Sequence, residues 1–194
     1  NISKETSYAI TEKEQITLSH NCSFPISSQY LKITPDRSHL FVSGVYKPSF
    51  KIFDLDQMSL KHSRGIDSEI IKFLPLSSGY KKVAMICEDR NVEFHAQYGF
   101  HFKIRTPKVG RDLCYVKNTA DLIIAATGQE LFRLNLEEGR FKSSLNLEGL
   151  GSNANIQDDL SEDGYYSYGA NCCGVGEQLG LLFSGCDDGR LRVY

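Results

Sequence analysis

Four short apolar runs recur along the chain, and each is followed by a turn and an alternating segment that ends in a bulky residue. The runs span residues 40–42, 83–86, 122–125 and 181–183. A continuous apolar run of this length is typical of a strand buried on both faces, whereas an alternating segment is typical of a half-buried strand. The pattern therefore predicts four copies of one β-sheet unit.

The copies follow one another with a period close to 40 residues. The alternating segments end at Phe53, Phe94, Leu134 and Tyr194, so the spacings between them are 41, 40 and 60 residues. The last spacing equals one period plus about 20 residues, which indicates an insertion in one repeat. A period near 40 with several strands in each unit is typical of a WD40-type β-propeller, and no segment shows helical periodicity. We therefore predict an all-β fold.

The repeats divide the chain into an arm, four blades and an insertion. We expect a polar N-terminal arm at residues 1–14 and a partial β-propeller domain at residues 15–194, with a β-like segment at 15–24. The insertion is an acidic loop near residues 151–171. Four units make an arc, so we expect a truncated ring whose open end pairs with another chain. The predicted blades lie near residues 29–65, 66–111, 112–150 and 172–194.

Composition and charge exclude several classes of function. Hydrophobic residues make up 41% of the chain and charged residues 24%, as in an ordinary globular domain. The net charge of −2 favours neither nucleic acid nor a membrane surface, and no apolar stretch is long enough to cross a bilayer. We therefore expect no membrane partner. The six cysteines form no disulfide framework or C-x-x-C pair, which favours a reducing, intracellular setting.

One segment concentrates positive charge. Residues 101–111 contain no acidic residue and carry four basic ones: Lys103, Arg105, Lys108 and Arg111. Alternation along a strand places Lys103 and Arg105 on the same side, and the following proline and glycine indicate an exposed turn that carries Lys108 and Arg111. Such a cluster can bind RNA phosphates or an acidic segment of a partner protein. The alternative is an ordinary solvated strand face followed by a loop.

The residues of the other candidate sites are better explained by an ordinary structural role than by binding or catalysis. The acidic residues of 158–163 lack the ligand spacing of a calcium loop, and His95 with His101 lacks the second ligand pair of a zinc site. We expect His95 to point outward beside a core-facing Phe94. The glycine-rich run 174–180 lacks the spacing and the strand–helix context of a dinucleotide-binding loop. With no nucleophile–base motif either, we predict a non-enzyme with no catalytic residue, cofactor, metal or small-molecule substrate.

Several strings on the predicted strands resemble one family more specifically than they resemble any WD consensus. They are SGVYKP at 43–48, VEFHAQYGF at 92–100, KIRTPKVGRD at 103–112 and RLNLEEGR at 133–140. The chain resembles the nucleolar WD-repeat ribosome-biogenesis proteins of the nucleolar-protein-ten family, over residues 15–157 and 172–194. The acidic insertion and the weakly basic arm depart from the family pattern.

The resemblance implies a non-catalytic scaffold of the nucleus and nucleolus that acts in small-ribosomal-subunit assembly and pre-rRNA processing. Its implied partners are assembly proteins of the small-subunit precursor particle, with pre-rRNA as a further candidate. The implied ring has seven blades, of which this chain forms the N-terminal part. A generic WD-repeat adaptor, such as a ubiquitin-ligase substrate receptor or a signalling scaffold, is the alternative. A third hypothesis is a propeller-type hydrolase, which would require acidic residues that converge on the central channel.

Overall fold

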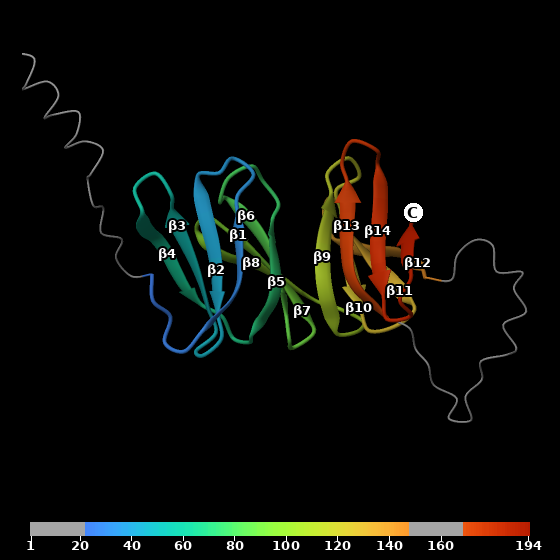
Figure 1. Ribbon diagram of the computed structural model, residues 1–194, viewed down its shortest axis with the longest axis horizontal. Helices are drawn as coiled ribbons and strands as arrows, with labels where there is room; N and C mark the ends of the chain where they lie inside the picture. Colours follow the sequence, from blue (N-terminus) through green and yellow to red (C-terminus); the bar gives the residue numbers. More distant parts are fainter. Residues whose placement is uncertain (1–21, 148–168) are drawn as a thin grey trace, which may run out of the picture.

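The second strand of each sheet contains one of the four apolar runs. The computed structural model describes residues 22–147 and 169–194, which form four antiparallel sheets (Figure 1). The first sheet contains β1 (Ser28–Ile33), β2 (His39–Gly44), β3 (Ser49–Asp54) and β4 (Ser59–Gly65). The second contains β5 (Ile70–Pro75), β6 (Lys82–Cys87), β7 (Asn91–Ala96) and β8 (Gly99–Arg105). The third contains β9 (Gly110–Val116), β10 (Asp121–Ala126), β11 (Glu130–Asn135) and β12 (Arg140–Asn146), and the fourth contains β13 (Ala170–Gly176), β14 (Leu181–Cys186) and β15 (Leu191–Val193).

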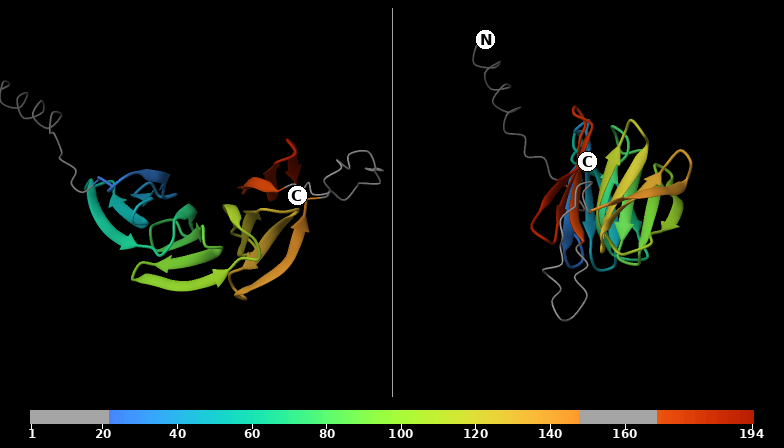
Figure 2. Two further views of the ribbon diagram at one scale, coloured as in Figure 1. Left: turned by 90° about the horizontal axis from the view of Figure 1, so that it is seen from below. Right: turned by 90° about the vertical axis from the view of Figure 1, so that its right-hand side faces the viewer.

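Each sheet is a propeller blade, because its strands pair with their neighbours in sequence order and the blades stand side by side. The first strands of successive blades touch, β1 with β5, β5 with β9 and β9 with β13. Figure 2 shows these first strands on the concave side of an open arc, with the outermost strands on its convex side. The predicted all-β propeller with four consecutive blades is thus confirmed.

The hydrophobic core lies between the blades, and both faces of the second strand contribute to it. Val83 and Met85 of β6 pack in a cluster shared with blade 1, whereas Ala84 and Ile86 pack in a cluster shared with blade 3. All four side chains are at most 2% exposed. Since neighbouring residues of a strand point to opposite faces, a strand between two blades must be apolar at every position. This requirement explains the continuous runs of β6 and β10; β14, in an end blade, alternates between buried and half-buried residues.

The boundaries of the insertion differ slightly from the prediction. The arm 1–14 and residues 151–168 of the insertion lie outside the described residues, and residues 22–24 of the expected β-like segment contain no strand. Strand β13 begins at Ala170, so residues 170 and 171 belong to blade 4 and not to the loop. Ala170 is fully buried between blades 3 and 4 and pairs with Cys186. The polar Asn171 beside it hid the start of this strand from the hydrophobic pattern.

The two ends of the arc leave apolar side chains uncovered in the part of the chain that the structure describes. Leu31 and Ile33 of β1 are 64% and 50% exposed on the face opposite to blade 2. Leu191 and Val193 of β15 are 69% and 52% exposed. These residues have the character of an interblade face, because the corresponding strand faces inside the arc are buried against a neighbour.

Candidate functional site: the basic segment and the blade ends

The four basic residues predicted as a binding site lie on two strands and on the connector that joins blades 2 and 3. Lys103 and Arg105 belong to β8, Lys108 lies in the connector 106–109, and Arg111 is the second residue of β9. The expectation that Arg111 lies on an exposed turn is wrong, since β9 begins at Gly110 and Arg111 is half-buried. Gly110, the first residue of this strand, packs closely against the side chain of the buried Ile86.

Lys103 compensates a buried carboxylate. Its Nζ lies 2.9 Å from Oε1 of Glu93 and 3.1 Å from Oδ2 of Asp89. The Glu93 side chain is only 4% exposed, and its hydrogen bond with Lys103 raises the pKa of the lysine. A buried charge left without its partner is strongly destabilising. Lys103 is therefore a structural residue of blade 2.

Arg111 ties blade 3 to blade 4. Its Nη1 lies 2.8 Å from Oδ2 of Asp187 in the β14–β15 turn, and it also donates a hydrogen bond to the Asn171 side chain of β13. The hydrogen bond from Arg111 lowers the pKa of the Asp187 carboxyl. An anion bound to Arg111 from outside the chain would compete with this aspartate.

Arg105 and Lys108 are the two residues of the predicted site that stay available. Both are exposed, and neither forms an ion pair within the described residues. Arg90 donates hydrogen bonds to the carbonyl oxygens of Thr106 and Pro107, which holds the connector against the β6–β7 turn. The same turn carries the exposed Glu88 and Asp89. Two exposed cations without an ion pair among the described residues thus remain in one four-residue stretch, next to an acidic turn.

His95 differs from its expected orientation, because it is buried. It is 6% exposed, and its Nε2 lies 3.3 Å from Oε2 of Glu93. A β-bulge shifts the pairing with β8 between Phe94 and His95, and Phe100 then packs edge-on against the imidazole. Burial lowers the pKa of His95.

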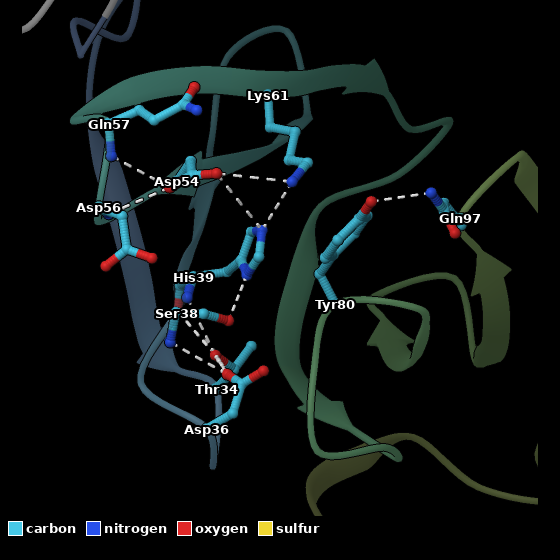
Figure 3. Close-up of polar contacts among 10 residues, drawn as sticks. All are labelled: Thr34, Asp36, Ser38, His39, Asp54, Asp56, Gln57, Lys61, Tyr80 and Gln97. Carbon is cyan, nitrogen blue, oxygen red and sulfur yellow. Dashed lines mark hydrogen bonds and ion pairs between the residues drawn. The ribbon is translucent and has the colours of Figure 1, made fainter.

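A polar cluster that sequence reasoning missed lies at the opposite ends of the strands, between blades 1 and 2 (Figure 3). His39, the first residue of β2, lies opposite Asp54, the last residue of β3. Lys61 Nζ lies 3.5 Å from Oδ2 of Asp54 and 3.1 Å from Nε2 of His39, and 4.5 Å from the ring centroid of Tyr80. The antiparallel register of the predicted hairpin was the signal that could have placed His39 beside Asp54.

The cluster contains a serine, a histidine and an aspartate, but its geometry gives Ser38 no general base. A lysine ammonium can only donate hydrogen bonds, so Nε2 of His39 accepts from Lys61. The proton of the neutral ring then lies on Nδ1, which donates to Oγ of Ser38 at 2.5 Å. Moreover, Nε2 is 4.0 Å from the Asp54 carboxylate, beyond hydrogen-bond distance. The arrangement fixes the end of blade 1 and does not activate a nucleophile.

Blade 3 repeats this polar pair at the same register position. Asp121, the first residue of β10, lies opposite Asn135, the last residue of β11, and accepts a hydrogen bond from it at 2.8 Å. Arg133 adds an ion pair with Asp121 at 2.7 Å. Within residues 22–147 and 169–194 there is no cluster of three or more metal-ligating side chains, and no helix that is long and apolar enough to span a membrane.

The fold and the blade-end contacts define a WD40-type β-propeller. A solved structure, the WD40 β-propeller domain of Doa1, superposes with a TM-score of 0.65 over 88% of this chain and 51% of that chain, at 9% sequence identity. The family model for the Nucleolar protein 10-like N-terminal domain matches residues 2–194. The chain belongs to this family, as the resemblance indicated.

Two relatives illustrate the family. The Ribosome biogenesis protein enp2 homolog of Schizosaccharomyces pombe is 43% identical over 96% of this chain and 27% of its own length. Nucleolar protein 10 of Homo sapiens is 33% identical over 94% of this chain and 24% of its own length. The chain thus spans about a quarter of the curated relatives it matches. Their names place the family in the nucleolus and in ribosome biogenesis.

Proposed function

We propose that this chain is a non-catalytic scaffold in the nucleolar assembly of the small ribosomal subunit. There it contributes to pre-rRNA processing through contacts with assembly proteins and with the pre-rRNA itself. The observation that carries the proposal is the 43% identity over 96% of the chain with a relative named for ribosome biogenesis. A propeller suits this role because its blade ends and rims offer several separate surfaces on one rigid body. The arc of four blades would then be part of a seven-bladed ring.

The size and RNA content of the particle with which the protein sediments test the proposal. A tagged form of the protein should sediment in a gradient with large precursor particles, and purification through the tag should enrich pre-rRNA of the small subunit. Depletion should reduce mature small-subunit rRNA and leave large-subunit rRNA nearly unchanged. Sedimentation with small complexes alone would favour the generic adaptor, and an equal loss of both rRNAs would contradict the assignment to the small subunit.

We propose Arg105 and Lys108 as the residues of the basic segment that contact RNA or an acidic partner. The double variant Arg105→Ala/Lys108→Ala leaves the Lys103 and Arg111 ion pairs intact, so it separates binding from stability. If both residues contact phosphates, RNA affinity should fall and the slope of log affinity against log salt should decrease by about two.

A matched control removes the same charge elsewhere. Lys47 and Arg190 are also exposed and lie in turns of blades 1 and 4. The variant Lys47→Ala/Arg190→Ala should bind RNA as tightly as the wild type. Equal RNA affinity of both double variants, measured by fluorescence anisotropy at several salt concentrations, would show that the basic segment is an ordinary solvated surface.

A further inference from the structure

A groove of about 640 Å³ opens between blades 2 and 3, at the same ends of the strands as the Figure 3 cluster. Its walls are mostly aromatic and aliphatic, and Phe102 is 49% and Tyr98 78% exposed. The hydroxyl of Tyr98 lies 2.8 Å from Nδ1 of His101, which holds the tyrosine in place at the β7–β8 turn. The side chains that line it include Lys82, Phe94, Tyr98, Phe102, Tyr115 and Glu137.

The two neighbouring blade junctions are closed at this position. Between blades 1 and 2, Tyr80 from the connector 76–81 lies over Lys61 and against the ring of His39, with the two ring centroids 4.4 Å apart. The backbone N–H of Asp36 also donates to the carbonyl of Ser78. Between blades 3 and 4, Lys117 and Glu177 join the corresponding turns by an ion pair of 2.7 Å.

The corresponding connectors of blades 2 and 3 lack such contacts among the described residues. The connector 117–120 of blade 3 is shorter than the connector 76–81 of blade 2, and it carries no aromatic residue that could fill the groove as Tyr80 does. Within the described residues, no hydrogen bond or ion pair joins the two connectors. The groove is therefore a local departure from the closed junctions on either side of it.

The charge beside the groove also lacks an internal partner. At the register position where blades 1 and 3 carry polar pairs, blade 2 has Lys82 opposite Ala96. Lys82 and its neighbour Lys81 are exposed, and neither forms an ion pair within the described residues. An apolar cleft with an unpaired ammonium at its edge is complementary to an apolar side chain next to a carboxylate.

We propose that this groove binds an extended peptide segment of a partner protein, with an aromatic or branched aliphatic side chain in the groove and an acidic residue facing Lys82. Single-stranded RNA fits less well, because nucleic-acid grooves are lined with basic residues and this one has the exposed Glu137 on its opposite wall. The aromatic walls are held by the hairpin before binding, which lowers the entropic cost of association. The proposal concerns a different surface from Arg105 and Lys108, and it does not depend on a role in ribosome assembly.

Peptide selection on the intact protein tests this proposal. Random dodecapeptides displayed on phage are selected on the wild type, and an enriched peptide is synthesised with a fluorescent label. We expect peptides that combine an apolar anchor with a nearby Asp or Glu. The variants Phe102→Ala and Lys82→Glu should each weaken binding about tenfold or more. Replacing the acidic residue of the peptide by Lys should restore most of the affinity that the Lys82→Glu variant has lost.

Phe100→Ala is the matched control, because Phe100 lies on the same strand, is 55% exposed and does not line the groove. It should bind the peptide as the wild type does, and thermal unfolding should show that all variants are folded. The proposal is overturned if no peptide is enriched, or if the enriched peptides bind Phe102→Ala and Lys82→Glu with unchanged affinity. It is also overturned if a labelled single-stranded RNA dodecamer binds more tightly than the peptide and loses affinity in the same two variants, since the groove would then be a nucleic-acid site.

Discussion

Gly110 shows how tightly blades 2 and 3 are packed at the scale of one residue. A Cβ at this position would overlap the side chain of Ile86, which is fully buried and cannot move aside, and would approach Ile124 to 3.3 Å. Gly110→Ala should therefore lower the free energy of unfolding by about 1–3 kcal/mol, as overpacked cores do. Gly65→Ala is the control, because nothing lies within 4 Å of a Cβ there. Equal unfolding midpoints for the two variants in urea would contradict this account.

Asp36 makes stability depend on pH in the acid range. Its Oδ1 accepts hydrogen bonds from Oγ1 of Thr34 at 2.5 Å and from the backbone N–H of Ser38 at 3.0 Å, which lowers the pKa of the carboxyl from 3.8 to about 2. Because the pKa is lower in the folded state than in the unfolded state, the ionised carboxylate stabilises the fold at pH values above the pKa of the unfolded state. This contribution is lost as the pH falls from about 4 to 2.

The comparison of wild type with Asp36→Asn should reveal this loss. The difference in their free energies of unfolding should be constant between about pH 5 and 7 and should shrink toward zero near pH 2. Asp56→Asn, whose carboxylate accepts no hydrogen bond within the described residues, should show no such change. Urea unfolding at a series of pH values measures both differences. A difference for Asp36→Asn that does not vary with pH would show that the hydrogen bonds to its carboxylate do not stabilise the fold.

The connector between the first two strands of a blade determines, at the scale of the element, whether a blade junction is closed. Tyr80→Ala should open the junction between blades 1 and 2 and lower the free energy of unfolding by about 2 kcal/mol, through lost aromatic packing and a lost cation–π contact with Lys61. Tyr80→Phe should cost only a few tenths of a kcal/mol, because the hydroxyl bonds the exposed Gln97.

A double-mutant cycle isolates the contact of Tyr80 with Lys61. Lys61→Ala and Tyr80→Ala should show a coupling energy of about 0.5–1 kcal/mol in chemical unfolding. If the effects of the two substitutions are additive, the ammonium does not stabilise the tyrosine, and the connector closes the junction by its apolar contacts alone.

The strands that could be predicted from the sequence are those whose burial gives them a distinct pattern of apolar residues. The apolar runs of β6 and β10 indicated strands correctly because both faces of each strand are buried. Glu93 and Lys103 lie opposite each other in one hairpin, so their ion pair follows from the register of β7 and β8. Arg111 and Asp187 come from different blades, so their contact depends on the packing of blade 3 on blade 4. For that reason the ion pair of Arg111 could not be predicted from the sequence, whereas that of Lys103 depends only on the register of one hairpin.

At the scale of the whole molecule, the arc has two ends that expose what the junctions inside it bury. Each internal junction covers the apolar side chains of two blades, and burial of one such side chain stabilises by about 1.5–3 kcal/mol. Leu31 and Ile33 at one end, and Leu191 and Val193 at the other, lack this cover. Among the strands of residues 22–147 and 169–194, β15 pairs with β14 alone, so within this part of the chain its outer edge also has unpaired backbone groups. Exposed apolar faces and open edges both favour association with another chain.

We therefore expect the 194-residue chain to associate with itself through the ends of the arc. Sedimentation velocity should show oligomers that increase between roughly 1 and 100 μM, since two uncovered faces of this kind give a modest affinity. Leu191→Lys/Val193→Lys should shift the distribution to monomer without unfolding, because both side chains are exposed in the single chain. Tyr98→Lys/Phe100→Lys adds the same charge in blade 2, which lies between blades 1 and 3, at residues that are 78% and 55% exposed, and it should leave association unchanged. If the two double variants associate equally, the contact lies elsewhere and the ends of the arc do not drive it.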